Sequence, residues 1–153
     1  MSKFKGRRVI LCQIFFTESA LNPHPKRFLR PYPLLMGFLI GGSWVLKETP
    51  KKGGIIDFNF ADMRVVESKS KKVVKWKCVK GPKEWVGTDL TFELKAKKDE
   101  TFVLFTHANW KKPDEFMRHC STKWATFLLS LKDWLEREEG RPAPYDVKIS
   151  VGD

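Results

Sequence analysis

The strongest constraint on the fold is a series of short segments that alternate apolar and polar residues, followed by one amphipathic helix. The alternation is clear in Val73–Val79 and Thr88–Ala96, where every second residue is apolar. Alternation with a period of two predicts half-buried β-strands, and the short polar connections predict antiparallel pairing. The expected strands are Arg8–Phe16, Ile55–Phe60, Met63–Glu67, Val73–Val79, Thr88–Ala96 and Thr101–Ala108.

The last third of the chain changes to helical spacing. One apolar stripe is formed by Trp124, Phe127, Leu128, Leu131, Trp134 and Leu135. We expect Ser121 or Thr122 to cap the start of this helix, and Gly140 to end it in the left-handed conformation. A curved sheet with one apolar face must bury that face, and this helix carries the matching stripe. The sequence therefore predicts an α+β fold in which an antiparallel sheet wraps one long C-terminal helix, and one helix leaves room for a cavity.

Length and composition narrow the class of protein. The 153 residues fit a single domain, and apolar residues at 42% with aromatics at 13% exclude a disordered chain. Three scattered cysteines, at positions 12, 78 and 120, do not form a disulfide framework. We expect reduced thiols and a cytoplasmic location, with no secretory signal. The longest uncharged run, residues 31–46, is broken by Pro and Gly, so we expect no membrane span.

The formal charge of +11 is unevenly distributed. Residues 1–56 hold ten Lys and Arg against two acidic residues, a net +8, whereas residues 57–153 hold nineteen against sixteen, a net +3. Lys75 and Lys77 flank Trp76, as in a single-strand nucleic-acid platform, but the alternation turns the lysines outward and the tryptophan inward. The charge therefore does not favour a nucleic-acid partner.

Four stretches together resemble a known family. They are Lys75–Thr88 (KWKCVKGPKEWVGT), Thr101–His107 (TFVLFTH), Met117–Trp124 (MRHCSTKW) and the closing stretch from Phe127 to Pro142. Over about residues 53–150 the chain is similar to START-like (SRPBCC) proteins of the heat-shock-protein-90-ATPase-activator-like kind. The resemblance implies a helix-grip fold with a hydrophobic cavity between sheet and C-terminal helix. Members of the superfamily bind lipids, polyketides or other apolar molecules, or act as chaperone-associated or stress-related modules.

The first 45 residues match the family poorly, although we assign all of residues 1–153 to one START-like domain. The resemblance implies a strand there, then two short helices with an aromatic pair that close one mouth of the cavity. Four prolines between Asn22 and Pro33 depart from that pattern. Two interpretations stay open: a divergent lid, or an altered reading of the gene upstream of residue 45.

The candidate site is the apolar surface between sheet and helix. Large aromatic walls with few polar groups are typical of sites for apolar ligands, and plain core packing is the alternative for each residue. His107 either orients a ligand oxygen or is a core histidine bonded to a neighbour. The expected lining residues are Phe58, Phe60, Trp76, Phe92, Val103, Phe105, His107, Trp124, Phe127, Leu128 and Leu131.

Other chemistry has little support in the sequence. The spacing of Cys78, His107, His119 and Cys120 fits no standard zinc site, so we expect no metal and no cofactor. No carboxylate pair, activated nucleophile or phosphate loop is apparent, and we expect no enzyme activity. The leading hypothesis is a non-enzymatic domain that binds a small apolar molecule. The alternative is a protein-interaction or stress-response module that resembles a chaperone-ATPase activator.

Overall fold

The computed structural model of the chain describes residues 9–17, 51–58, 60–69, 72–97, 100–137 and 139–149. In residues 9–17, and at positions 96, 97, 100 and 135, it describes the backbone alone. The Pro-rich stretch and the lid expected in residues 18–45 lie outside the described residues.

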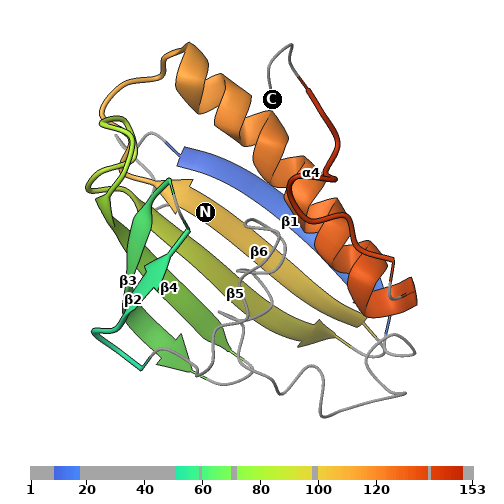
Figure 1. The fold of residues 1–153 in the computed structure, drawn as a ribbon. Helices are drawn as coiled ribbons and strands as arrows, with labels where there is room; N and C mark the ends of the chain where they lie inside the picture. The colour runs from blue at the N-terminus through green and yellow to red at the C-terminus, as the bar shows by residue number, and fades with distance from the viewer. Residues whose placement is uncertain are drawn as a thin grey trace.

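The described strands form one six-stranded sheet in which every neighbouring pair is antiparallel. The order across the sheet is β1-β6-β5-β4-β3-β2, so β1 pairs with β6, which comes last of the described strands in the sequence (Figure 1). This confirms the antiparallel α+β architecture. The bounds are β1 Val9–Thr17, β2 Ile55–Asp57, β3 Asp62–Lys69, β4 Val73–Lys80, β5 Asp89–Lys97 and β6 Glu100–Ala108.

The register places the buried side chains in rows across the sheet. Val65 pairs with Trp76, Trp76 with Leu90, and Leu90 with His107. A second row joins Val74, Phe92 and Phe105. All of these side chains are buried, because strand residues two apart share one face and the opposite face meets solvent. The predicted inward positions of β4, β5 and β6 are therefore confirmed.

The expected strand Ile55–Phe60 is too long. β2 ends at Asp57, and a turn follows in which the Phe58 N–H donates to the Ala61 carbonyl and the Phe60 N–H donates to the Phe58 carbonyl. The turn breaks the alternation that was expected to place Phe58 and Phe60 on one face. Phe58 stays buried, but Phe60 is 46% exposed.

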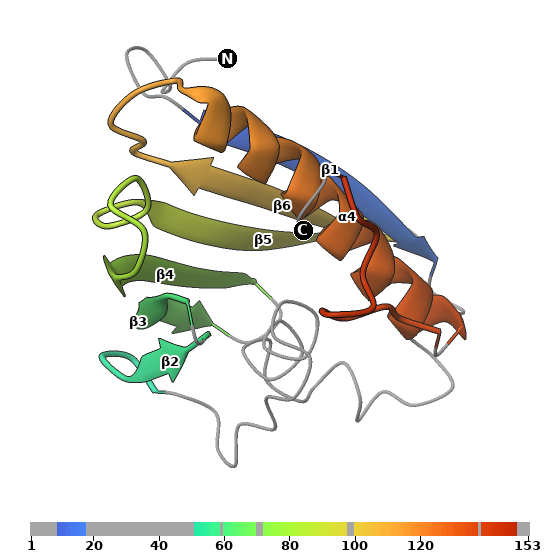
Figure 2. The ribbon, with the colours of Figure 1, turned by 45° about the horizontal axis from the view of Figure 1, so that its top comes forward.

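The helix α4, Glu115–Arg137, lies across the concave face on the side of β1 and β6 (Figure 2). It buries Cys120, Trp124, Leu128 and Leu131, which follow the helical spacing of three and four residues. Phe127 and Met117 are partly buried against the same core. The apolar stripe predicted from the sequence is thus the face that the sheet holds.

The helix starts earlier than expected, because its cap is Asp114 and neither Ser121 nor Thr122. The Asp114 carboxylate accepts the Met117 N–H at 3.0 Å, which satisfies one of the free donors at a helix start. That backbone hydrogen bond, with help from Lys112, holds the pKa of Asp114 below its ordinary value despite partial desolvation. Ser121 and Thr122 lie within the helix, on its exposed face.

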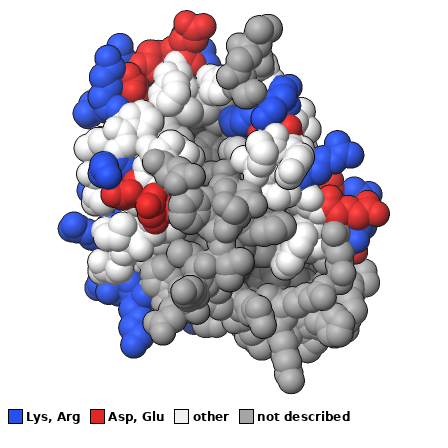
Figure 3. All heavy atoms as spheres, in the orientation of Figure 1, with Lys and Arg blue, Asp and Glu red and all other residues white. Residues whose placement is uncertain are grey.

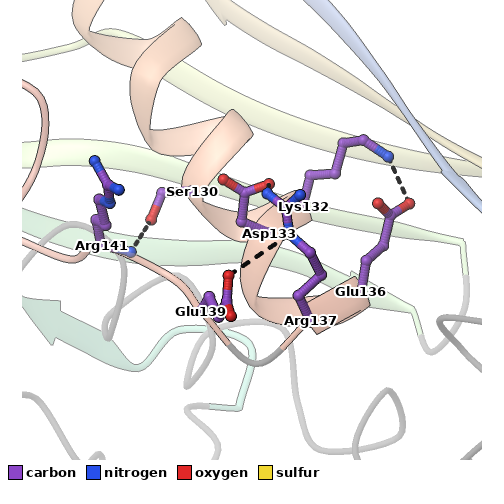
Figure 4. Close-up of polar contacts among 7 residues, drawn as sticks. All are labelled: Ser130, Lys132, Asp133, Glu136, Arg137, Glu139 and Arg141. Carbon is purple, nitrogen blue, oxygen red and sulfur yellow. Dashed lines mark hydrogen bonds and ion pairs between the residues drawn. The ribbon is translucent and has the colours of Figure 1, made fainter.

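Gly140 follows the helix but does not take the left-handed conformation that we expected. Gly140 lets the chain pass close to α4, since a Cβ atom there would lie 2.7 Å from the Trp134 Cβ and 3.2 Å from the Ser130 carbonyl oxygen. The Ser130 hydroxyl then accepts the Arg141 N–H at 2.7 Å, which anchors the returning chain (Figure 4). Ion pairs on the last turns join Lys132 to Glu136 and Arg137 to Asp133 and Glu139, as the same view shows. The chain therefore reverses tightly at the end of α4.

Candidate functional site

Residues 141–149, here called the C-terminal segment, run back along α4 toward its N-terminal half (Figure 1). The segment is fixed at one end by Ser130 and further along by Lys123, whose ammonium group donates to the Val147 carbonyl at 3.3 Å. The side of α4 that carries Lys123 therefore faces the C-terminal segment instead of solvent.

A pocket of about 710 Å³ lies between α4, the C-terminal segment and the loop that follows β4. This volume is within the range of small-molecule sites, about 300–1,000 Å³. Its described lining residues are Phe60, Trp85, Phe116, His119, Cys120, Lys123, Trp124, Phe127, Ala143, Pro144, Asp146 and Lys148.

One wall of the pocket is aromatic. The rings of Trp85 and Trp124 stack with centroids 6.2 Å apart and planes inclined by 15°. Phe60 meets Trp85 edge-on at 5.3 Å, and Phe127 meets Trp124 in the same way at 6.2 Å. The wall is held in place because Trp124 also packs on Phe105 of the core, at 4.4 Å.

The other wall is polar and comes from α4 and the C-terminal segment. The Asp146 carboxylate lies between two ammonium groups, with Lys123 Nζ 2.8 Å from Oδ2 and Lys148 Nζ 3.3 Å from Oδ1. Burial by itself would raise the pKa of Asp146, but the two lysines outweigh that effect and keep it below the ordinary value. Asp146 is therefore ionised at neutral pH and holds the lysines together.

Cys120 lines the pocket as an unreactive thiol. Its Sγ accepts the indole N–H of Trp85 at 3.4 Å, and burial raises the pKa of Cys120 to about 11. A thiol with so high a pKa is almost entirely protonated at neutral pH and is a poor nucleophile.

His107 lies behind the aromatic wall, in a buried chain of hydrogen bonds. The Trp124 indole, which can only donate, bonds to Nδ1 at 3.2 Å, so the imidazole proton is on Nε2. Nε2 then donates to the Thr88 hydroxyl at 2.8 Å, and that hydroxyl donates to the Trp85 carbonyl at 2.7 Å. Burial lowers the pKa of His107 to about 3. The ring is neutral at physiological pH, and both of its nitrogens have protein partners.

The eleven expected lining residues divide into two groups. Three border the pocket: Phe60, Trp124 and Phe127. The other eight are buried in the core, and these are Phe58, Trp76, Phe92, Val103, Phe105, His107, Leu128 and Leu131.

Several pocket residues were not anticipated from the sequence. Trp85 lies in a polar loop, where a large aromatic residue was a usable signal. Phe116 lies in the first turn of α4, before the expected caps Ser121 and Thr122, and Asp146 and Lys148 belong to a stretch with no periodic pattern. Only the tertiary contact between α4 and the C-terminal segment brings these side chains together.

The described residues also line a second, smaller pocket. A pocket of about 320 Å³ beside Trp110 is lined by exposed lysines and two acidic residues. Within the described ranges, no cluster of three His, Cys, Asp or Glu side chains could hold a metal, and no helix is long and apolar enough to cross a membrane. Among the residues coloured in Figure 3, several Lys and Arg side chains lie next to Asp and Glu side chains.

Several solved structures are similar to this chain. The chain is 30% identical to the Aha1 dimer from Colwellia psychrerythraea, over 87% of this chain and 99% of that one, with a TM-score of 0.59. It shares the fold of CalU16 from Micromonospora echinospora, at 15% identity, coverage of 90% and 78%, and a TM-score of 0.58. It also shares the fold of the major latex-like protein 151 from Panax ginseng, at 18% identity, coverage of 87% and 97%, and a TM-score of 0.55.

No family model matches the sequence, and no curated protein matches it. The identity to the Colwellia protein over nearly its whole length, together with the sheet that wraps one C-terminal helix, decides the family. The chain belongs to the START-like (SRPBCC) superfamily and, within it, to the Aha1-like proteins.

Proposed function

We propose that the chain is a non-enzymatic domain that binds a small, largely apolar molecule in the pocket between α4 and the C-terminal segment. The observation that carries the proposal is the pocket itself, whose volume of about 710 Å³ is bounded on one side by four aromatic rings. Apolar rings with few polar groups favour burial of an apolar ligand. Two of the groups that could do chemistry near the pocket are held inactive, since Cys120 is a high-pKa thiol and His107 lies behind the wall with both nitrogens bonded.

The test uses the neutral fluorescent probe N-phenyl-1-naphthylamine. Trp85 and Trp124 border the pocket, so we expect the bound probe to quench tryptophan fluorescence. Phe116→Glu places a carboxylate in the lining of the pocket and should weaken binding by tenfold or more. Leu129→Glu is the matched control, because Leu129 is on the same helix and is exposed but does not border the pocket. Absence of binding below about 1 mM, or equal loss in both variants, would refute the proposal.

A second candidate function is a protein-interaction module. Tyr145 and Val147 on the C-terminal segment are 79% and 51% exposed, next to the basic side chain of Lys148. Exposed apolar residues beside a charge are typical of interaction surfaces. The similar Colwellia protein is described as an Aha1 dimer, which favours a protein partner.

Purified bacterial heat-shock protein 90 tests this second candidate. We expect the chain to raise the ATPase rate of that protein at low salt, and Tyr145→Glu to abolish the increase. An unchanged rate with the wild-type chain, at low and at high salt, would exclude this activity.

A further inference from the structure

Hydrogen bonds behind the aromatic wall join its two tryptophans in one buried network, here called the indole network. The Trp85 indole donates to Cys120 on α4, and Trp124, one helical turn further along, donates to His107 of β6. His107 donates to the Thr88 hydroxyl, which donates back to the Trp85 carbonyl. Each of these five residues is at most 6% exposed, so water does not compete for the bonds. The network therefore ties together three separate parts of the chain: α4, β6 and the loop that follows β4.

His107 is the member of the network that meets both indoles. Its imidazole stands perpendicular to the Trp85 ring, with centroids 5.1 Å apart and planes at 89°, and to the Trp124 ring, at 6.1 Å and 90°. Edge-to-face contact of this kind is a favoured geometry for aromatic rings. Since the two indole planes differ by only 15°, one imidazole supports both rings in the same way.

The hydrogen bond from Trp124 to His107 fixes the orientation of an indole that borders the pocket. A buried N–H group without an acceptor costs about 1–3 kcal/mol. Without His107 Nδ1, the indole would therefore be driven to rotate toward another acceptor, and the surface that faces the pocket would change. A wall that is fixed before the ligand arrives needs no ordering on binding, and this favours affinity.

Building on the binding role proposed above, we propose that His107 is a positioning residue of the pocket. It does not contact the ligand, but it fixes the stacked indoles of Trp85 and Trp124 on which the ligand lies. The acceptor at Nδ1 orients Trp124 directly. The donor at Nε2 holds the Thr88 hydroxyl and, through it, the loop that carries Trp85.

Three substitutions of His107 separate its two hydrogen bonds. His107→Asn keeps an acceptor bonded to Cγ, as Nδ1 is, but loses the donor to Thr88. His107→Gln carries its amide one bond further out, so it keeps a donor near the Nε2 position and has no acceptor at the Nδ1 position. His107→Leu removes both hydrogen bonds.

Binding is measured with N-phenyl-1-naphthylamine, through the fluorescence of the probe itself. We expect His107→Leu and His107→Gln to bind the probe about tenfold more weakly than the wild type, because the Trp124 indole loses its acceptor. His107→Asn should recover the affinity to within about threefold of the wild type, because it keeps that acceptor. Equal affinities of the Asn and Gln variants would overturn the positioning role.

The indole N–H signals in ¹H–¹⁵N NMR spectra give a reading that needs no ligand. Trp124→Phe assigns the signal of Trp124. We expect that signal to keep its wild-type chemical shift in His107→Asn and to move in His107→Gln. A merely structural role for His107 would move the signal equally in both variants, and that result also overturns the proposal.

Val65→Ala is the matched control for lowered stability. Val65 is buried in β3 and does not border the pocket, so its truncation destabilises the core without touching the indole network. At a temperature where all variants are folded, we expect Val65→Ala to bind the probe as the wild type does. A loss as large as that in His107→Gln would overturn the positioning role and leave the apolar site standing. If the wild type does not bind the probe below about 1 mM, the binding role itself fails, and the positioning role with it.

Discussion

The buried chain of hydrogen bonds through His107 makes a sharp prediction for Thr88. Thr88→Val keeps the shape of a fully buried side chain but removes the hydroxyl that accepts the Nε2 proton of His107. The imidazole cannot escape by moving its proton to Nδ1, since the Trp124 indole already donates to that nitrogen. One buried donor is therefore left without a partner.

The magnitude follows from the contacts that are lost. An unpaired buried donor costs about 1–3 kcal/mol, and the lost hydroxyl bond to the Trp85 carbonyl adds a smaller amount. That carbonyl keeps the Thr88 N–H at 2.8 Å, so it is not orphaned, and the extra methyl of valine offsets part of the loss. We expect Thr88→Val to lower the free energy of unfolding by about 2–3 kcal/mol.

Thr88→Ser is the matched control, because it keeps the hydroxyl and loses one methyl group. We expect it to cost about 1 kcal/mol, the value of one buried methyl-sized group. Denaturation by guanidinium chloride at neutral pH, followed by tryptophan fluorescence and by far-ultraviolet circular dichroism, measures both variants. If apolar packing alone mattered at this site, valine would be the better substitute. A Thr88→Val protein at least as stable as Thr88→Ser would refute the hydrogen-bond argument.

Three further predictions concern His107 and the two ends of α4. The pKa of His107 is about 3 in the folded chain and near 6.5 in the unfolded chain, so its contribution to stability is complete above 6.5 and is lost as the pH falls toward 3. The free energy of unfolding of the wild type should fall relative to that of His107→Leu over this window, by at most about 1.4 kcal/mol per pH unit, and parallel curves would contradict this. Asp114→Ala should lower the free energy of unfolding by about 1 kcal/mol, because it removes the helix cap. Ser121→Ala and Thr122→Ala should change it by less than about 0.5 kcal/mol. If thermal unfolding showed a larger loss for Ser121→Ala or Thr122→Ala, that residue and not Asp114 would be the cap. Gly140→Ala forces a Cβ atom against Trp134 and should lower the free energy of unfolding, measured by chemical denaturation, by about 1–3 kcal/mol. An unchanged value would show that the backbone at this chain reversal can shift to accommodate the Cβ atom.

Much of the fold could be predicted because alternation directly reports which side of a strand is buried. Trp76, Phe92 and Phe105 were placed on the inner face from this period alone, and the structure has them there. Alternation assigns the wrong face to a residue where the backbone turns. Between Phe58 and Ala61 two short-range hydrogen bonds reverse the chain, so Phe60 leaves the face that counting assigned to it.

The candidate site could be predicted only in part, because a cavity is a property of packing and not of one segment. Helical spacing identified Trp124 and Phe127, which border the pocket. The same spacing assigned Leu128 and Leu131 to the lining, but these two are buried in the core. Trp85 and Asp146 became pocket residues through contacts between segments far apart in the sequence, and no local pattern encodes those contacts.

The position of α4 in the chain has a consequence for biosynthesis. All six described strands precede α4 in the sequence, so the ribosome releases these strands before the helix that packs on them. Until residues 115–149 emerge, Phe92 and Phe105 lack their contacts with Trp124 of α4, and exposed apolar surfaces of this kind promote association between nascent chains. Residues 115–149 therefore cover this apolar face only after the strands have been made, and translation that stalls before Glu115 should leave a product that aggregates or is degraded.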